Sequence, residues 1–322
     1  MRRIDVFNGD ADGICALIQW RLARPAAAEP VTGVKRDIRL LAKIQDAQDA
    51  AISVLDISLD SNRQDLERLL RQGAQVFYVD HHYCGDLPVY PNLTTLIDPS
   101  PDACTSLLMH AHLQHAYPGW AAAGAFGDNL DAAARRVLQP LALPKTQIEQ
   151  LQQLGEAVNY NAYGEDLDDL LLHPAELYRR LAVHPWPLDF CAAEAELWRA
   201  LSETRQSDLQ LALQQTPDYQ GPGAAAVILP DAQWARRING SFGNHLAKRH
   251  PQRAHAIITH HRQGGYQISV RAPLNRPAGA DALCRRYPGG GGRQAAAGVN
   301  QLPPERLDEF LRDFAASYNQ PA

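Results

Sequence analysis

Residues 74–82 read AQVFYVDHH, and this segment decides how the rest of the chain is interpreted. Its first part is rich in aromatic and β-branched residues, which are typical of a buried strand. An acid and two imidazoles, Asp80, His81 and His82, follow directly. Because ligands of α/β sheets gather beyond the carboxyl ends of the strands, we interpret this segment as a strand that delivers a functional cluster.

Two further strands are expected to end in acids. An apolar strand over Ile4–Phe7 leads into a loop that contains Asp10 and Asp12, and the apolar spacing after this loop predicts a helix. Another strand, over 51–55, ends at Asp56. Taken alone, the two loop acids fit an Asx turn that caps a helix equally well. Gathered on one sheet edge with the imidazoles, however, these acids would repel one another without cations, and carboxylates with few thiolates nearby suit Mg²⁺ or Mn²⁺.

Composition limits the class of protein. The 322 residues suffice for two domains, and apolar residues make up 45% of them. No apolar run approaches the roughly 18 to 20 residues of a membrane span, and no signal-like segment is present, so we expect a cytoplasmic protein without a membrane partner. The net charge of −5 argues against a surface that coats long nucleic acids, although it leaves room for a local basic pocket. The five cysteines form no CxxC pair, which argues against a thiolate zinc site.

Four motifs in order resemble those of the DHH phosphoesterase superfamily: Asp10-Ala11-Asp12-Gly13, Asp56, Asp80-His81-His82 and Gly127-Asp128. This superfamily includes RecJ-type exonucleases, phosphodiesterases of small oligonucleotides and cyclic dinucleotides, exopolyphosphatases and one class of pyrophosphatases. The resemblance implies two Mn²⁺ or Mg²⁺ ions bridged by Asp56, with Asp10, Asp12, His81 and Asp128 as the other ligands. It also implies that Asp80 orients an imidazole and that His82 contacts the scissile phosphate, which a metal-activated water attacks.

One position departs from this pattern. Many members of the superfamily have a metal-binding histidine four residues before the first aspartate, and here that residue is Val6. Asn8 lies nearby in the sequence and could contribute an oxygen. We therefore expect the first metal to be held more weakly, which keeps an enzyme of low activity among the alternatives.

A glycine-rich stretch, Gly289 to Gly298, is expected to begin a helix near the C-terminus. Backbone N–H groups of Gly290, Gly291 and Gly292 beside a helix N-terminus would form an anion cradle, to which Arg293 adds charge. A glycine run alone would also fit a flexible loop. The stretch resembles the GGGHxxAAG signature of the DHH-associated domain, with Arg293 in the place of the histidine, and Arg271 matches an arginine that ends a strand in that domain. The resemblance implies that these residues bind the far phosphate or base of a substrate.

The expected fold is α/β, with a parallel-sheet N-terminal DHH domain and a smaller α/β C-terminal substrate-binding domain. We place the first domain at 1–189, a connecting helix and linker at 190–223, and the second domain at 224–322. Helical spacing predicts one continuous helix over 190–213, and a strand is expected over 31–34.

These features favour a metal-dependent phosphodiesterase of short or cyclic oligonucleotides, because a separate Gly/Arg platform suits a substrate with a second anionic end. A pyrophosphatase or exopolyphosphatase would share the metal centre but need no base contacts. A RecJ-like exonuclease is disfavoured because no added oligonucleotide-binding domain and no basic stripe are evident. A non-catalytic nucleotide sensor is the fourth alternative, and a homodimer is compatible with all of them.

Overall fold

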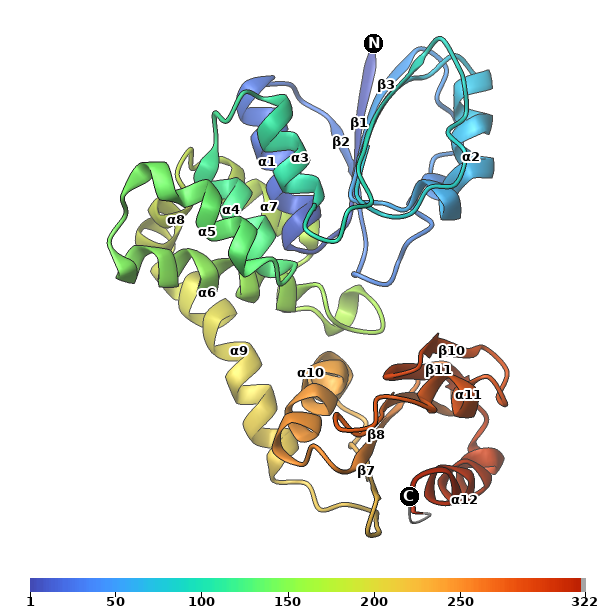
Figure 1. The fold of residues 1–322 in the computed structure, drawn as a ribbon. Coiled ribbons are helices and arrows are strands. Elements are labelled where there is room, and N and C mark those ends of the chain that lie inside the picture. The colour runs from blue at the N-terminus through green and yellow to red at the C-terminus, as the bar shows by residue number, and fades with distance from the viewer. Residues whose placement is uncertain (320–322) are drawn as a thin grey trace. The chain divides into compact units, whose positions relative to one another are not determined.

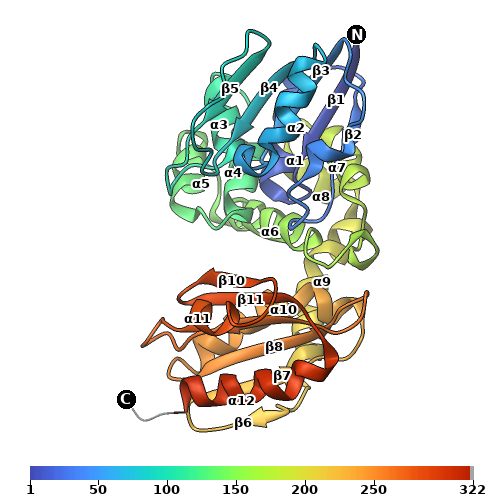
Figure 2. The ribbon, with the colours of Figure 1, turned by 90° about the vertical axis from the view of Figure 1, so that its right-hand side faces the viewer.

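The structure is a computed structural model that describes residues 1–319. The chain divides into two compact units, Met1–Thr204 and Arg205–Ala322, and the division falls inside helix α9 (Ala195–Leu213). Each unit has its own sheet with helices packed on it (Figures 1 and 2). The expected fold class, a parallel α/β unit followed by a smaller α/β unit, is thereby confirmed. Among the residues described, no helix combines the length and the apolar character required to cross a bilayer.

The first unit is built on a five-stranded, entirely parallel sheet with strand order β2-β1-β3-β4-β5. The strands are β1 (Arg2–Phe7), β2 (Glu29–Val31), β3 (Ala50–Leu55), β4 (Gln75–Asp80) and β5 (Leu93–Ile97). Successive side chains enter different cores, as the pleat requires. Ile4 and Val6 pack in one apolar cluster, whereas Phe7 belongs to the cluster on the other face.

Helices cover both faces of this sheet. They are α1 (Ala11–Ala23), α2 (Leu59–Arg71), α3 (Thr105–His112), α4 (Pro118–Gly127), α5 (Asp131–Leu138), α6 (Lys145–Asn161), α7 (Pro174–Ala182) and α8 (Pro187–Ala193). Figure 1 shows α2 on one face and α1 and α3 on the other. Because all strands are parallel, their carboxyl ends meet at one edge, where the loops to α1, α2 and α3 begin.

Two boundaries differ from the expectations. β2 ends at Val31, so residues 32–34 form a loop instead of the expected strand. The helix expected over 190–213 is divided into α8 and α9 at Glu194, whose backbone leaves the helical region with φ −117° and ψ 47°. Arg180 of α7 binds the carboxylate of Glu194 with two N–H groups, and this contact fixes the residue in the break.

The second unit contains a six-stranded mixed sheet with order β10-β11-β9-β8-β7-β6, in which only β7 and β8 pair in parallel. Its strands are β6 (Tyr219–Gln220), β7 (Ala224–Ile228), β8 (Ala254–His260), β9 (Tyr266–Arg271), β10 (Gly290–Arg293) and β11 (Ala296–Leu302). Its helices are α10 (Gln233–Arg249), α11 (Ala280–Cys284) and α12 (Leu307–Tyr318). Phe310 and Phe314 of α12 pack into the apolar core against the sheet.

The prediction that a helix begins in the glycine-rich stretch is wrong, because this stretch forms the hairpin of β10 and β11. The alanines favour a helix locally, but β11 lies between β9 and β10 and buries Val299 and Leu302, so tertiary packing overrides propensity. Glycine is required at 292, where φ is +138°, and at 298, where an added Cβ would lie 2.6 Å from the Ile268 carbonyl oxygen. The cradle expected beside a helix N-terminus is therefore absent from residues 289–298.

Candidate metal centre

The loop after β1 supplies the first two acids at the carboxyl edge of the sheet. Asp10 caps the N-terminus of α1 and accepts a hydrogen bond from the Gly13 N–H at 3.1 Å. Its own N–H donates to Asn8 Oδ1 at 3.3 Å. Asp12 lies in the first turn of the helix, and both carboxylates are almost fully buried. The Asx-type cap and the acidic pair therefore occur together, and one does not exclude the other.

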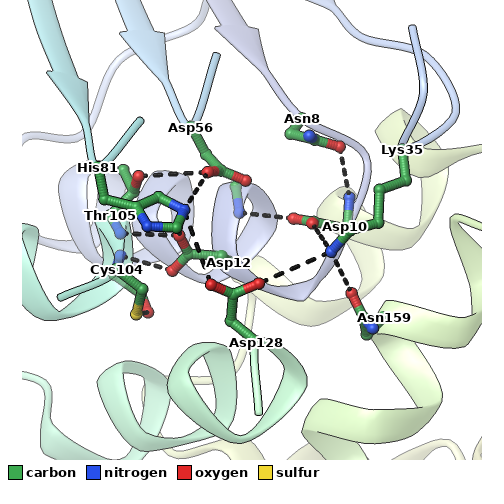
Figure 3. Close-up of polar contacts among 12 residues, drawn as sticks. Asn8, Asp10, Asp12, Lys35, Asp56, His81, Cys104, Thr105, Asp128 and Asn159 are labelled. Atoms are coloured by element: carbon green, nitrogen blue, oxygen red, sulfur yellow. Dashed lines mark hydrogen bonds and ion pairs between the residues drawn. The ribbon is translucent and has the colours of Figure 1, made fainter. Parts of the chain in front are cut away.

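The N-terminus of α3 orients Asp12. The Thr105 N–H donates to one carboxylate oxygen and the Ser106 N–H donates to the other, each at 2.7 Å. Backbone N–H groups in the first turn of a helix have no partner within the helix and carry the positive end of its dipole. A segment almost a hundred residues away in the sequence thereby fixes the direction of this carboxylate (Figure 3).

Asp56 follows β3 in a left-handed conformation, with φ +59°. Aspartate tolerates this region better than most residues, although it is uncommon outside glycine. The Asp56 N–H donates to the Val79 carbonyl at 3.0 Å, which keeps the residue in register with β4 beside it. The turn holds a carboxylate that is 2% exposed at the centre of the cluster.

Three carboxylates surround the Nε2 atom of His81. Its Nε2 lies 3.4 Å from Asp56 Oδ1, 3.7 Å from Asp128 Oδ2 and 3.9 Å from Asp12 Oδ2. Asp128 reaches the cluster from the C-terminal end of α4 (Figure 3). Asp12, His81 and Asp128 form one group of donors close enough together to hold a metal ion, and Asp56, His81 and His82 form a second group that shares His81. Carboxylate and imidazole donors suit Mn²⁺ or Mg²⁺.

His82 lies beside this group and is oriented by Asp80. Its Nδ1 is 2.7 Å from Asp80 Oδ1, and Asp80 is fully buried. This hydrogen bond is the main reason why the pKa of His82 lies above its usual value. The His82 side chain is 44% exposed, so the ring can meet a ligand from solvent.

The electrostatics of the cluster show that its carboxylates are short of positive charge. Burial, and then the charges of the other aspartates, raise the pKa of Asp56 well above its ordinary value. Burial and the Asp12 charge also raise the pKa of Asp128. A bound divalent cation would relieve both effects, because it stabilises the ionised carboxylates. The residues present therefore fit a hard divalent cation.

Lys35 belongs to the site, and the sequence analysis missed it. Its Nζ lies 2.6 Å from Asp10 Oδ2, 3.1 Å from Asn159 Oδ1 and 3.7 Å from Asp128 Oδ1. Burial raises the pKa of Asp10, but the Lys35 charge and the hydrogen bonds from Lys35, the Gly13 N–H and Asp56 together lower it below its usual value. We predicted a strand over 31–34, so Lys35 was not recognised as a residue of the loop at the carboxyl edge. In the structure β2 ends at Val31, and its carboxyl end lies at the same edge of the sheet as those of the other strands. The rule applied to the acids, that residues after parallel strands meet at one edge, would have found it.

The position that departs from the superfamily pattern offers no ligand. Val6 is fully buried in the apolar cluster that contains Ile4 and residues of α2. Asn8 is nearby, but its side-chain oxygen already accepts the Asp10 N–H.

The other predicted substrate-binding residues lie in the second unit. Arg271 ends β9, and its guanidinium donates to Asn244 Oδ1 at 2.7 Å and to Ser269 Oγ at 2.8 Å. Arg293 ends β10 and is exposed. In Gly290 an added Cβ would collide with the Cys284 carbonyl, whereas nothing lies within 4 Å of the corresponding point of Gly291. Close packing thus explains why glycine is needed at some positions of the run, such as 290. The role of the run in substrate binding stays a prediction.

The chain has the fold of solved nuclease and phosphodiesterase structures, which is the fold that the sequence motifs led us to expect. Manganese-bound exonuclease RecJ matches with a TM-score of 0.64 and 19% identity, over 98% of this chain and 89% of that one. RecJ of Thermus thermophilus in complex with Mn²⁺ matches with a TM-score of 0.63 and 20% identity, over 98% of this chain and 52% of that one.

A third match is PggH, a pGpG-specific phosphodiesterase of Vibrio cholerae, with a TM-score of 0.53 and 13% identity. That match covers 98% of this chain and all of the other. No protein-family model and no curated protein matches the sequence. At these identities the likeness establishes the fold, and the activity has to be argued from the site.

Proposed function

We propose that the protein is a divalent-cation-dependent phosphodiesterase that hydrolyses short oligonucleotides, linear or cyclic. The observation that carries this proposal is the convergence of Asp12, Asp56 and Asp128 on His81 Nε2, with an oriented imidazole, His82, beside them. Two of the similar structures are manganese complexes of a nuclease, and a third is a dinucleotide phosphodiesterase. Mn²⁺ is the cation that we expect.

Each side chain has a defined task in this proposal. Asp12, Asp56, His81 and Asp128 would hold the cation, which when bound would supply charge neutralisation and activation of a water. Asp80 orients His82 through Nδ1, so that the ring can donate from its other nitrogen to an oxygen of the scissile phosphate. The raised pKa of His82 favours the protonated ring, which donates from both nitrogens.

The substrate class rests on groups that a simple phosphatase would not need. Tyr83 follows His82 directly and is 77% exposed, so its ring is available to stack on a nucleobase. Within the second unit, we assign phosphate binding to Arg271 and Arg293, because a guanidinium can bind a phosphate with two N–H groups. Neither an aromatic platform nor a second anion site is required to cleave pyrophosphate.

The test is a panel of substrates: pGpG, pApA, a five-nucleotide RNA, cyclic dinucleotides, pyrophosphate and polyphosphate, each with Mn²⁺, Mg²⁺ or EDTA. We expect mononucleotide release with Mn²⁺, none with EDTA, and at least a roughly 100-fold lower rate in His81→Ala. His112→Ala, which removes an exposed histidine outside the site, serves as the matched control. Cleavage of pyrophosphate or polyphosphate alone would refute the substrate class. No cleavage of any substrate, with Mn²⁺ bound, would refute the enzyme and favour a sensor.

A further inference from the structure

We propose that the Lys35 ammonium takes the place of one of the two metal ions that the superfamily pattern implies. The centre then binds a single divalent ion per chain, at Asp12, Asp56, His81 and Asp128, and Lys35 supplies the second positive charge. This inference deepens the proposed function, because it defines the cations that would meet a phosphate at the same site.

The acidic cluster has two halves that differ in their cation. In one half, three carboxylates lie within 3.9 Å of His81 Nε2. In the other half, Lys35 Nζ lies 2.6 Å from Asp10 Oδ2 and 3.7 Å from Asp128 Oδ1 (Figure 3). The ammonium is thus placed against the same carboxylates that a second metal ion would need.

Among the residues described, the Asp10 half lacks the donors for a second metal. One oxygen of Asp10 accepts the Gly13 N–H at 3.1 Å, and the other accepts from Lys35. Val6, which stands where a histidine ligand is usual, is buried among apolar residues. Asn8 Oδ1 is engaged by the Asp10 N–H. A divalent ion at this position would have to displace the half-buried Lys35 ammonium from Asp10, and it would find no imidazole ligand at position 6.

The fold itself holds Lys35 in position. The Lys35 N–H donates to the Ala162 carbonyl at 2.9 Å, which ties the loop to the end of α6. Asn159 of α6 accepts from Lys35 Nζ through Oδ1 and donates through Nδ2 to the Tyr163 hydroxyl at 3.2 Å. The amide is therefore oriented to receive a cation. Gly9 leaves room for this loop, because an added Cβ would collide with the Gly33 carbonyl.

A fixed ammonium can do part of what a metal ion does for a phosphate. It offers a permanent charge and N–H donors to a non-bridging oxygen, as lysine does in other phosphate sites. Its charge is one unit rather than two, so the site keeps less positive charge than a two-metal centre. This arrangement assigns Lys35 to phosphate binding, and a cation held by the other half of the cluster would supply the activation of water.

The experiment counts Mn²⁺ on the full chain without substrate. Metal-free protein is titrated with Mn²⁺, bound metal is measured by mass spectrometry, and electron paramagnetic resonance reports whether the ions are coupled. We expect one uncoupled Mn²⁺ per chain in the wild type. In Lys35→Gln we expect two, with the coupled spectrum of ions about 4 Å apart. Lys43→Gln, which removes an exposed lysine paired with Asp37, should keep one.

Two coupled ions in the wild type would overturn the proposal, and so would a single ion in Lys35→Gln. If Lys35→Gln does not fold, the number of Mn²⁺ ions bound by Asp10→Asn, compared with the number bound by the wild type, tests the proposal instead. A one-metal centre predicts that this variant still binds one Mn²⁺ with affinity within tenfold of the wild type, whereas a two-metal centre predicts the loss of one ion of two. These counts require no turnover, so failure of the substrate panel leaves them intact, and a count of two leaves the proposed hydrolysis intact.

Discussion

Gly127→Ala is the sharpest test of how the fold positions the site. Gly127 is the last residue of α4, and Asp128 follows it into the cluster. A Cβ added at Gly127 would lie 2.9 Å from the Gly155 carbonyl oxygen and closer still to the Ala11 side chain at the start of α1. Ordinary carbon contacts are about 3.5 to 4.0 Å, so α4 has to move by roughly 1 Å away from α1 and α6.

The magnitude follows from two opposing effects. Overpacking of a well-packed core costs about 1–3 kcal/mol, and alanine in place of a helical glycine returns about 0.5–1 kcal/mol. The net loss is about 1–2 kcal/mol, which lowers the melting temperature of a unit of this size by a few degrees. The same movement shifts Asp128, which lies 3.7 Å from both His81 Nε2 and Lys35 Nζ, so Mn²⁺ affinity should fall about tenfold.

The assay is urea unfolding of the metal-free chain, with Mn²⁺ titration alongside. Gly240→Ala is the matched control, because Gly240 lies in α10 and the nearest atom to its added Cβ is 3.7 Å away. The control should be neutral or up to about 1 kcal/mol more stable, with unchanged Mn²⁺ affinity. A Gly127→Ala protein with wild-type stability and wild-type Mn²⁺ affinity would show that the close approach of α4 to α1 does not position Asp128.

Three further outcomes are expected. Arg21→Met leaves the buried Asp5 without its 2.8 Å partner and should cost about 3 kcal/mol in urea unfolding, and a loss below about 1 kcal/mol would contradict this. The pKa of His255 is lowered to about 4 by burial and by the nearby charges of His250 and Arg253. The unfolded chain therefore binds this proton first, and stability should fall by about 1–2 kcal/mol between about pH 7 and pH 5, a slope that His255→Gln should flatten. Mn²⁺ at about a hundred times its dissociation constant should stabilise the wild type by about 2.7 kcal/mol, measured as a shift in melting temperature, and should not stabilise Asp56→Asn.

Most of the first unit could be predicted because each signal was local. A short apolar run followed by an acid gives both the strand and its carboxyl end, and parallel pairing then places Asp56 near His81 without further information. The glycine-rich hairpin could not be predicted in this way. Its alanines favour a helix, and the reasons for a strand, burial of Val299 and the close approach of Gly298 to β9, appear only when β9 is adjacent.

The part of the site that was missed lies in contacts between segments distant in the sequence. Nothing near Thr105 indicates that its N–H binds Asp12, since any helix start has such groups. Lys35 carries no motif, although it is one of only four lysines among 31 basic residues. The pairing of β2 with β1 brings the loop after β2 to Asp10, so a correct end for β2 in the sequence would have pointed to Lys35.

Val6 and Lys35 account for each other physically. A histidine at position 6 would be a neutral ligand that leaves the charge of Asp10 for a metal to balance. With Val6 in the apolar core, that balance has to come from elsewhere, and Lys35 provides it at 2.6 Å. A histidine at position 6 would therefore add a ligand to the site, but Lys35 would still occupy the position of the second cation. We infer that restoring a second metal requires the change at 35, and that a change at 6 alone leaves the metal count at one.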